Sequence, residues 1–85
     1  MIQQYAADLA KQMGIELSRV SFFDGQLLGC RDCHLLQLHS GGQMESAVVY
    51  QQDLEYLQQG TITKRLETRL RSVLSRLQAQ LGLDP

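Results

Sequence analysis

Cysteine, proline and aromatic residues are scarce in this 85-residue sequence, which has two cysteines, one proline and no tryptophan. Two cysteines cannot form the set of disulfides that holds small secreted domains together, so the composition favours a reducing compartment. The first residues show no basic leader followed by an apolar run, and no segment approaches the roughly 20 apolar residues of a membrane span. We therefore expect a cytoplasmic protein that makes no contact with a membrane.

A chain of this length is expected to form one domain, residues 1–85, and to bury only about 60% of the surface that its unfolded form exposes. Because two cysteines add little cross-linking, a domain of this size often gains stability by association. We expect a protein partner, and the simplest such partner is a second copy, which gives a homodimer.

Positive charge is concentrated at the end of the chain. Residues 1–60 carry seven acidic and three basic side chains, a net charge of −4, whereas residues 61–85 carry five basic and two acidic ones, a net charge of +3. A basic segment can mark nucleic-acid binding, but this one has no aromatic side chain for base stacking, and the acidic remainder would repel phosphate. The pattern argues against a nucleic-acid partner.

Two segments have the apolar spacing of amphipathic helices. The first covers residues 1–13 and ends at Gly14, which can adopt the left-handed conformation of a helix C-terminus. The second begins near Ile62, extends for about five turns and is stopped by Gly82 and Pro85. The apolar stripe of this second helix consists of Ile62, Leu66, Leu70, Val73, Leu74, Leu77 and Leu81.

The middle of the chain contains strand and turn signals. Residues 18–23 alternate apolar and polar side chains, as a half-buried strand does. The Asp24 and Gly25 pair that follows is typical of a tight hairpin turn, and residues 26–32 would then form a short strand or a loop. Residues 51–60 favour a short helix or a turn.

The strongest strand signal is the hairpin CHLLQLHSGGQMESAVVY, in which Gly41 and Gly42 can supply the positive φ of a two-residue turn. Pairing Ser40 with Gln43 sets the register, and directly opposed residues then share a face. One face consists of His34, Leu36, Leu38, Glu45, Ala47 and Val49. The other consists of Cys33, Leu35, Gln37, His39, Met44, Ser46, Val48 and Tyr50. Both faces are half apolar, so a helix can cover one while the other binds a partner.

The segment GCRDCHLLQLH brings together Cys30, Cys33, His34 and His39, which nominally suffice for a tetrahedral zinc site. Adjacent Cys33 and His34 would point to opposite faces of a strand, and His39 lies about 20 Å beyond Cys33 along an extended chain. A structural site also takes its second ligand pair from a separate element, which is missing here. We expect no metal; a thiol- or metal-dependent regulator that uses these four residues is the alternative.

The same C-x-x-C-H string is the attachment pattern of c-type haem, and a C-x-x-C pair can be redox-active. Haem attachment needs a helix around the motif, whereas the flank here has the pattern of a strand. A redox-active cysteine typically begins a helix, and Asp32 between the two thiols would raise their pKa. The favoured interpretation is two ordinary thiols and no cofactor.

The order of elements predicts an α+β fold, α-β-β-β-α, with an N-terminal helix, a three-stranded antiparallel sheet and a long C-terminal helix. The stretches YAADLAKQMGIE, SRVSFF and CHLLQLHSGGQMESAVVY resemble the N-terminal part of class I type III secretion chaperones, which are small, acidic, dimeric proteins that hold a segment of an effector. The resemblance covers roughly residues 2–50 and the closing helix, and it consists of element order and hydrophobic spacing. Those chaperones usually have further strands and a dimerisation helix, which this sequence lacks. The resemblance implies ATP-independent holding of a partner segment by apolar patches and strand addition.

No nucleophile elbow, phosphate-binding glycine loop or carboxylate pair with room for a pocket is present, so we expect a non-enzymatic protein. The predicted function is a protein-binding adaptor or chaperone-like module that contacts its partner through the second sheet face and the last helix. A three-stranded sheet that already covers the first helix should leave part of the last helix to a second subunit, with a row of arginines at the rim. The residues expected in the interface are Leu35, Met44, Val48, Tyr50, Arg65, Arg69, Leu70 and Arg76.

Overall fold

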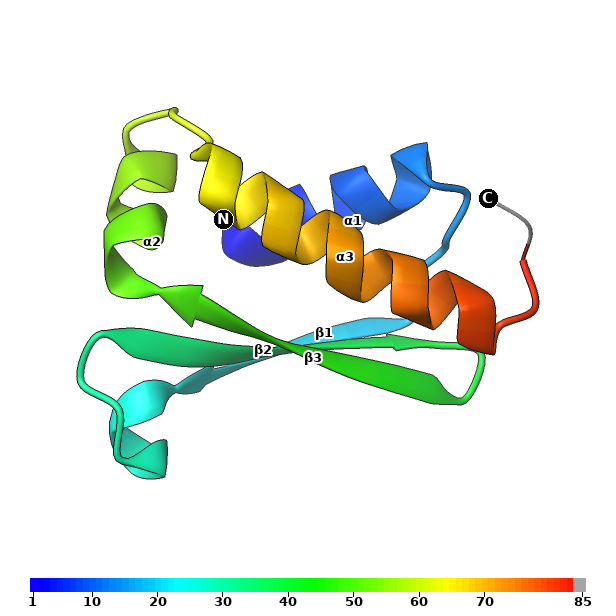
Figure 1. Ribbon diagram of the computed structural model, residues 1–85, viewed down its shortest axis with the longest axis horizontal. Helices are drawn as coiled ribbons and strands as arrows, with labels where there is room; N and C mark the ends of the chain where they lie inside the picture. The colour runs from blue at the N-terminus through cyan, green and yellow to red at the C-terminus, as the bar shows by residue number, and fades with distance from the viewer. Residues whose placement is uncertain (84–85) are drawn as a thin grey trace.

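A computed structural model describes residues 1–83, without the side chains of Leu27 and Leu28. Its elements are α1 (Ile2–Gln12), β1 (Arg19–Asp24), the 3₁₀ helix η1 (Gly25–Leu28), β2 (Cys33–Ser40), β3 (Gln43–Tyr50), α2 (Gln51–Gln58) and α3 (Lys64–Gln80). The predicted α+β fold is confirmed, and α2 is the short helix between the sheet and α3 (Figure 1). None of the described helices is long and apolar enough to cross a bilayer. Pro85, the predicted stop signal, lies outside the described residues.

The sheet has the strand order β1-β2-β3, and both pairs of neighbours are antiparallel. The predicted register of the hairpin is confirmed, since Ser40 lies opposite Gln43. Gly41 and Gly42 have φ angles of 55° and 80°, in the left-handed region that a two-residue turn requires. Side chains of β2 and β3 are therefore divided between the two sheet faces as the alternation predicted.

The connection between β1 and β2 differs from the predicted hairpin turn. The carboxylate of Asp24 accepts a hydrogen bond of 2.9 Å from the Gln26 N–H and caps η1, so the Asp-Gly pair begins a 3₁₀ helix. Gly25 is needed because a Cβ at this position would lie 1.7 Å from the carbonyl oxygen of Cys33. Residues 26–32 contain the rest of η1 and a loop but no strand, and β1 pairs with β2 across this longer connection.

Helices α1 and α3 lie side by side over one face of the sheet, and the hydrophobic core fills the space between the two layers (Figure 1). The sheet contributes Leu36, Leu38, Ala47 and Val49 to this core. None of the α-helices in residues 1–83 covers the opposite face, which is called the open face below (Figure 1).

The prediction that Leu70 belongs to an interface is wrong, because its side chain is 0% exposed within the single chain. The expectation that one sheet face cannot shield both helices failed because α1 turns small side chains, Ala6 and Ala10, into the core. These small residues let α3 pack closely, and its apolar stripe from Leu66 to Leu77 is buried without a second subunit. Ile62 lies before the helix, which begins after the capping residue Thr63.

Candidate functional site

The open face exposes an apolar row that crosses all three strands. Phe23 of β1 lies opposite Leu35 of β2, which in turn lies opposite Val48 of β3. Phe23 and Val48 are 42% and 39% exposed, although both are large and apolar, and Leu35 between them is partly buried. Contiguous exposed apolar side chains indicate an interaction surface. We call Phe23, Leu35 and Val48 the apolar row.

The other two predicted interface residues of the sheet lie at the two ends of β3 on this same face. Met44 is 44% exposed and lies opposite His39, whereas Tyr50 is partly buried and lies opposite Cys33. Sequence reasoning missed Phe23 as a member of the surface. The signal was present, because Phe23 directly follows Phe22 in a strand and only one of two successive side chains can face the core.

A groove of about 570 Å³ lies between β3 and α3. Its lining residues are Ser46, Ala47, Val48, Arg65, Thr68, Arg69, Ser72, Val73 and Arg76. Each α3 member has another member three or four residues away along the helix, so together they form one helix face. This helix face carries the small side chains of Thr68 and Ser72 and the long side chains of three arginines. We call this hollow the β3–α3 groove.

The floor of the groove is the outer edge of β3, which is an edge strand. It pairs only with β2 in the described sheet, so every other backbone N–H and C=O of β3 points outward without a strand partner. Such groups are a template onto which another extended chain can add. The predicted arginine row thus lies directly beside a strand edge.

The end of the groove near α2 is built around Tyr50. The guanidinium carbon of Arg65 lies 4.6 Å from the centre of the Tyr50 ring, and that of Arg69 lies 5.4 Å from it. Cations over an aromatic face are attracted by the ring quadrupole. Tyr50 therefore holds two positive charges at the rim of the groove.

Asp53 fixes one of these cations. Its side chain, with 3% of the residue exposed, accepts bonds of 3.0 and 3.1 Å from Nε and Nη2 of Arg65 and a bond of 2.9 Å from Oγ1 of Thr63. Thr63 in turn caps α3 by accepting a bond from the Leu66 N–H. The hydrogen bond with Asp53 raises the pKa of Arg65 above its ordinary value. Asp53 therefore joins α2 to the start of α3, a role that sequence reasoning did not predict.

Arg76 closes the opposite end of the groove. Its Nε lies 3.1 Å from a carboxylate oxygen of Glu45 on β3, and Gln80 donates to the other oxygen of the same carboxylate. Two of the three predicted arginines thus pair with acidic groups of their own chain.

Arg69, between these two ion pairs, is different. Its Nε is buried and has no hydrogen-bond partner among the described residues. A buried charged donor without an acceptor is costly. Arg69 is therefore the arginine of the groove for which the described residues supply no carboxylate partner.

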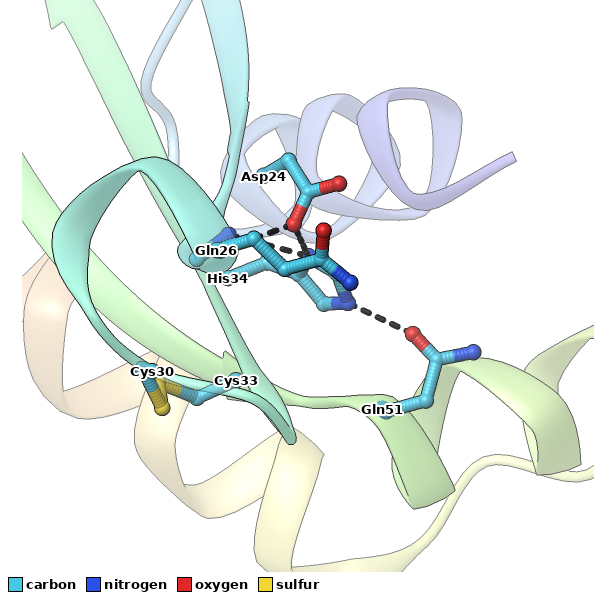
Figure 2. Close-up of a disulfide and its surroundings, with 7 residues drawn as sticks. Asp24, Gln26, Cys30, Cys33, His34 and Gln51 are labelled. Atoms are coloured by element: carbon cyan, nitrogen blue, oxygen red, sulfur yellow. Dashed lines mark hydrogen bonds and ion pairs between the residues drawn. A yellow bond between two sulfur atoms is a disulfide. The ribbon is translucent and has the colours of Figure 1, made fainter.

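The predicted cysteine and histidine cluster does not come together as one site. Cys30 and Cys33 form a disulfide, so the interpretation of two ordinary thiols does not describe this structure. His34 points to the helix side of the sheet, where its Nδ1 accepts from the Gly25 N–H at 3.4 Å and its Nε2 donates to Oε1 of Gln51 at 2.5 Å (Figure 2). His39 lies at the far end of β2, opposite Met44. Within the described part of the chain, no three such residues could hold a metal ion together.

No protein-family model, curated protein or solved structure matches this chain. The geometry of the groove, the open face and the disulfide loop is therefore the basis for the functional proposals below.

Proposed function

We propose that the chain is a non-enzymatic protein-binding module of the adaptor or chaperone type, which binds an extended acidic segment of a partner protein. The observation that carries this proposal is the free edge of β3, which lies between the exposed apolar row and the arginine-lined wall of α3. A strand edge supplies backbone hydrogen bonds, and the two flanking surfaces can select alternate side chains of the bound segment.

The spacing of the arginines agrees with an extended ligand. Arg65 and Arg69 are one helical turn apart, about 6 Å along α3. Alternate side chains of a β-strand are about 7 Å apart and point to the same side. A segment added to β3 would therefore present every second side chain to the arginines and the intervening ones to the open face beside Val48. Acidic residues alternating with apolar ones fit both surfaces.

Charge disfavours self-pairing of two β3 edges. A two-fold axis at such a junction would place α3 of each copy on the same side of the joined sheet, with the two arginine rows facing each other. Like charges in such proximity oppose association. The groove therefore favours an acidic partner over a second copy of the chain.

The lining of the groove also supports a binding function. Among the described residues, its lining contains hydroxyl groups on Ser46, Thr68 and Ser72 but no histidine, cysteine or carboxylate that could activate them as nucleophiles.

A second copy fits the open face instead. A two-fold axis that lies between two facing sheets, parallel to the strands and above Leu35, would place Phe23 opposite Val48 of the partner subunit. Each apolar row would then cover the other, as the inner faces of a β-sandwich do. We propose that the module is a homodimer through this face. A cytoplasmic location is part of the same proposal, because the chain has a single cysteine pair, short of the disulfide framework of small secreted domains.

Binding of two hexapeptides tests the proposed ligand. The peptide TEVEVT alternates glutamate with valine, and TQVQVT is its uncharged control. Calorimetry should show binding of the first peptide that weakens with added salt, and weaker or no binding of the second. Arg69→Gln should reduce the affinity for TEVEVT by roughly fivefold, the equivalent of about 1 kcal/mol for a partly exposed ion pair. Equal affinities for the two peptides would contradict the acidic preference.

Sedimentation of the Leu35→Asp variant tests the dimer separately. A charge in the middle of the apolar row should shift the chain to a folded monomer, because an unpaired charge cannot be buried between two sheets. Ser21→Asp, one row away on β1, is the matched control and should leave the dimer less affected. Peptide binding should persist in the Leu35→Asp monomer, so failure of the dimer and failure of the groove are distinguishable. A wild-type chain that sediments as a folded monomer at micromolar concentration would refute self-association.

A further inference from the structure

The disulfide loop caps helix α2. The Cys30 and Cys33 bond closes a short ring, with a sequence separation of 3, and the carbonyl of Asp32 inside this ring accepts a bond of 2.8 Å from the Gln51 N–H. Gln51 is the first residue of α2, and the preceding residue, Tyr50, supplies no side-chain cap. Because the first N–H groups of a helix have no acceptor within the helix, Asp32 supplies one that is missing.

The ring is itself held at two further points. The Cys30 N–H donates a bond of 2.8 Å to the carbonyl of Gly25, and the Cys33 carbonyl packs directly against Gly25. Figure 2 shows the disulfide and the contact between His34 and Gln51, which ties the side chain of the first α2 residue to β2. Residues 30–33 are thus the junction of η1, β2 and α2.

The effect of this junction extends to the groove. Two residues beyond Gln51, Asp53 binds Arg65, and Arg65 covers the Tyr50 ring. Asp32, Gln51 and Arg65 also line a common hollow of about 410 Å³. A conformational change in the disulfide ring can therefore alter the position of Arg65 through the first turn of α2.

The disulfide bond lies where it can be broken without disrupting the hydrophobic core. Both cysteines are partly exposed, and all of the buried apolar residues of the core cluster lie outside residues 30–33. A ring this short also restricts the unfolded chain less than a long loop does, so its contribution to stability is small.

We propose that Cys30 and Cys33 form a reversible thiol–disulfide site whose oxidised state fixes the first turn of α2 and the Arg65 end of the groove. The co-reactant is a dithiol of a protein or a small molecule. One of its thiolates attacks a sulfur of the pair, the disulfide bond breaks and a mixed disulfide forms, with the other cysteine leaving as a thiolate that takes up a proton. The second thiol of the co-reactant then attacks the co-reactant sulfur of the mixed disulfide, and the remaining protein cysteine leaves as a thiolate that takes up a proton. Two electrons and two protons pass to the protein, and the co-reactant becomes a disulfide. This inference does not depend on the proposed binding function.

Hydrogen exchange in dithiothreitol buffers with graded ratios of the reduced and oxidised reagent tests the site on the full chain. Intact mass should change reversibly by about 2 Da between the reduced and the oxidised buffer. Reduction should accelerate exchange of the Gln51 amide by at least roughly tenfold, while the amides of Leu36 and Leu38 in the sheet are unchanged. The NMR signal of the Arg65 Nε–H reports the contact with Asp53, and this signal should broaden in the reduced chain.

The variant Cys30→Ser with Cys33→Ser is the matched control. It should remain folded, and its Gln51 amide should exchange at the rate of the reduced chain in both buffers. Three results would overturn the proposal: equal Gln51 exchange in the oxidised and reduced chains, a pair that stays reduced in the oxidised buffer, or global unfolding on reduction. Binding of TEVEVT is measured independently, so neither proposal rests on the outcome of the other.

Discussion

Replacing Asp53 with asparagine should destabilise the chain more than substituting an exposed charged residue that has no buried partner. Asp53→Asn keeps the shape of the side chain and the possibility of a bond to Thr63, but it loses the negative charge that binds Arg65 through two hydrogen bonds. A buried hydrogen bond to a charged group contributes about 1.5–3 kcal/mol. Because the Arg65 side chain is 50% exposed and can regain water, we discount this value and expect a loss of about 1–2 kcal/mol.

Removing the cation of this ion pair, instead of the anion, should cost at least as much stability. Arg65→Met leaves a buried carboxylate without its cation, and removing one partner of a buried pair is more damaging than neutralising the buried group itself. Urea denaturation measures both variants, with the exposed Glu16→Gln as control, which should stay within about 0.5 kcal/mol of the wild type. Thermal unfolding should move by roughly 4–8 °C for each kcal/mol lost. If Asp53→Asn costs less than about 0.5 kcal/mol, Asp53 does not hold α2 against α3 and the reasoning fails.

Three further predictions concern single positions. Gly42→Val should cost more than about 1 kcal/mol in urea denaturation, because valine tolerates the φ of 80° at this position poorly although there is open space for its Cβ. Gly42→Asn should cost less, because asparagine adopts positive φ more readily, and equal losses for the two variants would contradict a conformational cause. Gly25→Ala should cost more than about 2 kcal/mol, since the added Cβ would overlap the carbonyl of Cys33, and a wild-type melting temperature would show that η1 can move away. Burial, and then the nearby charge of Glu67, raise the pKa of Tyr5, so the folded chain resists ionising this group. The neutral Tyr5 side chain stabilises the folded chain fully below the ordinary pKa near 10, and this stabilisation is lost as the pH rises through the higher pKa of the folded chain. Tyr5→Phe should remove this loss from the pH profile of unfolding.

The hairpin was predictable because two independent signals agree. Alternation of apolar and polar side chains defined the faces of β2 and β3, and the pair Gly41 and Gly42 fixed the register between them. The last helix was predictable from its spacing, although it begins at Lys64, two residues later than the apolar pattern, because Thr63 caps it.

Other features depend on contacts that a local pattern does not contain. Asp24 and Gly25 suit both a hairpin turn and a capped 3₁₀ helix, and only the close approach of Cys33 distinguishes them. The burial of Leu70 depends on the small side chains of α1, which are distant in sequence.

The candidate site was predictable only in part, for the same reason. The row of arginines was visible from helical spacing, yet which of them lacks a carboxylate partner depends on ion pairs with Asp53 and Glu45, contacts between elements that helical spacing does not contain. The open face was predictable from the hairpin, but Phe23 joins it only through pairing of β1 with β2. The disulfide likewise depends on the three-dimensional path of the loop before β2.

Hydrogen exchange of the β3 amides, measured with and without TEVEVT, tests the central claim most directly. The amides of Gln43–Tyr50 that point away from β2 have no strand partner in the described sheet and should exchange quickly in the free chain. Strand addition predicts that these amides become protected when the peptide binds, while the inward amides paired with β2 are protected in both states. Binding of the peptide with no added protection along β3 would contradict the account, because the arginines would then act without the strand edge.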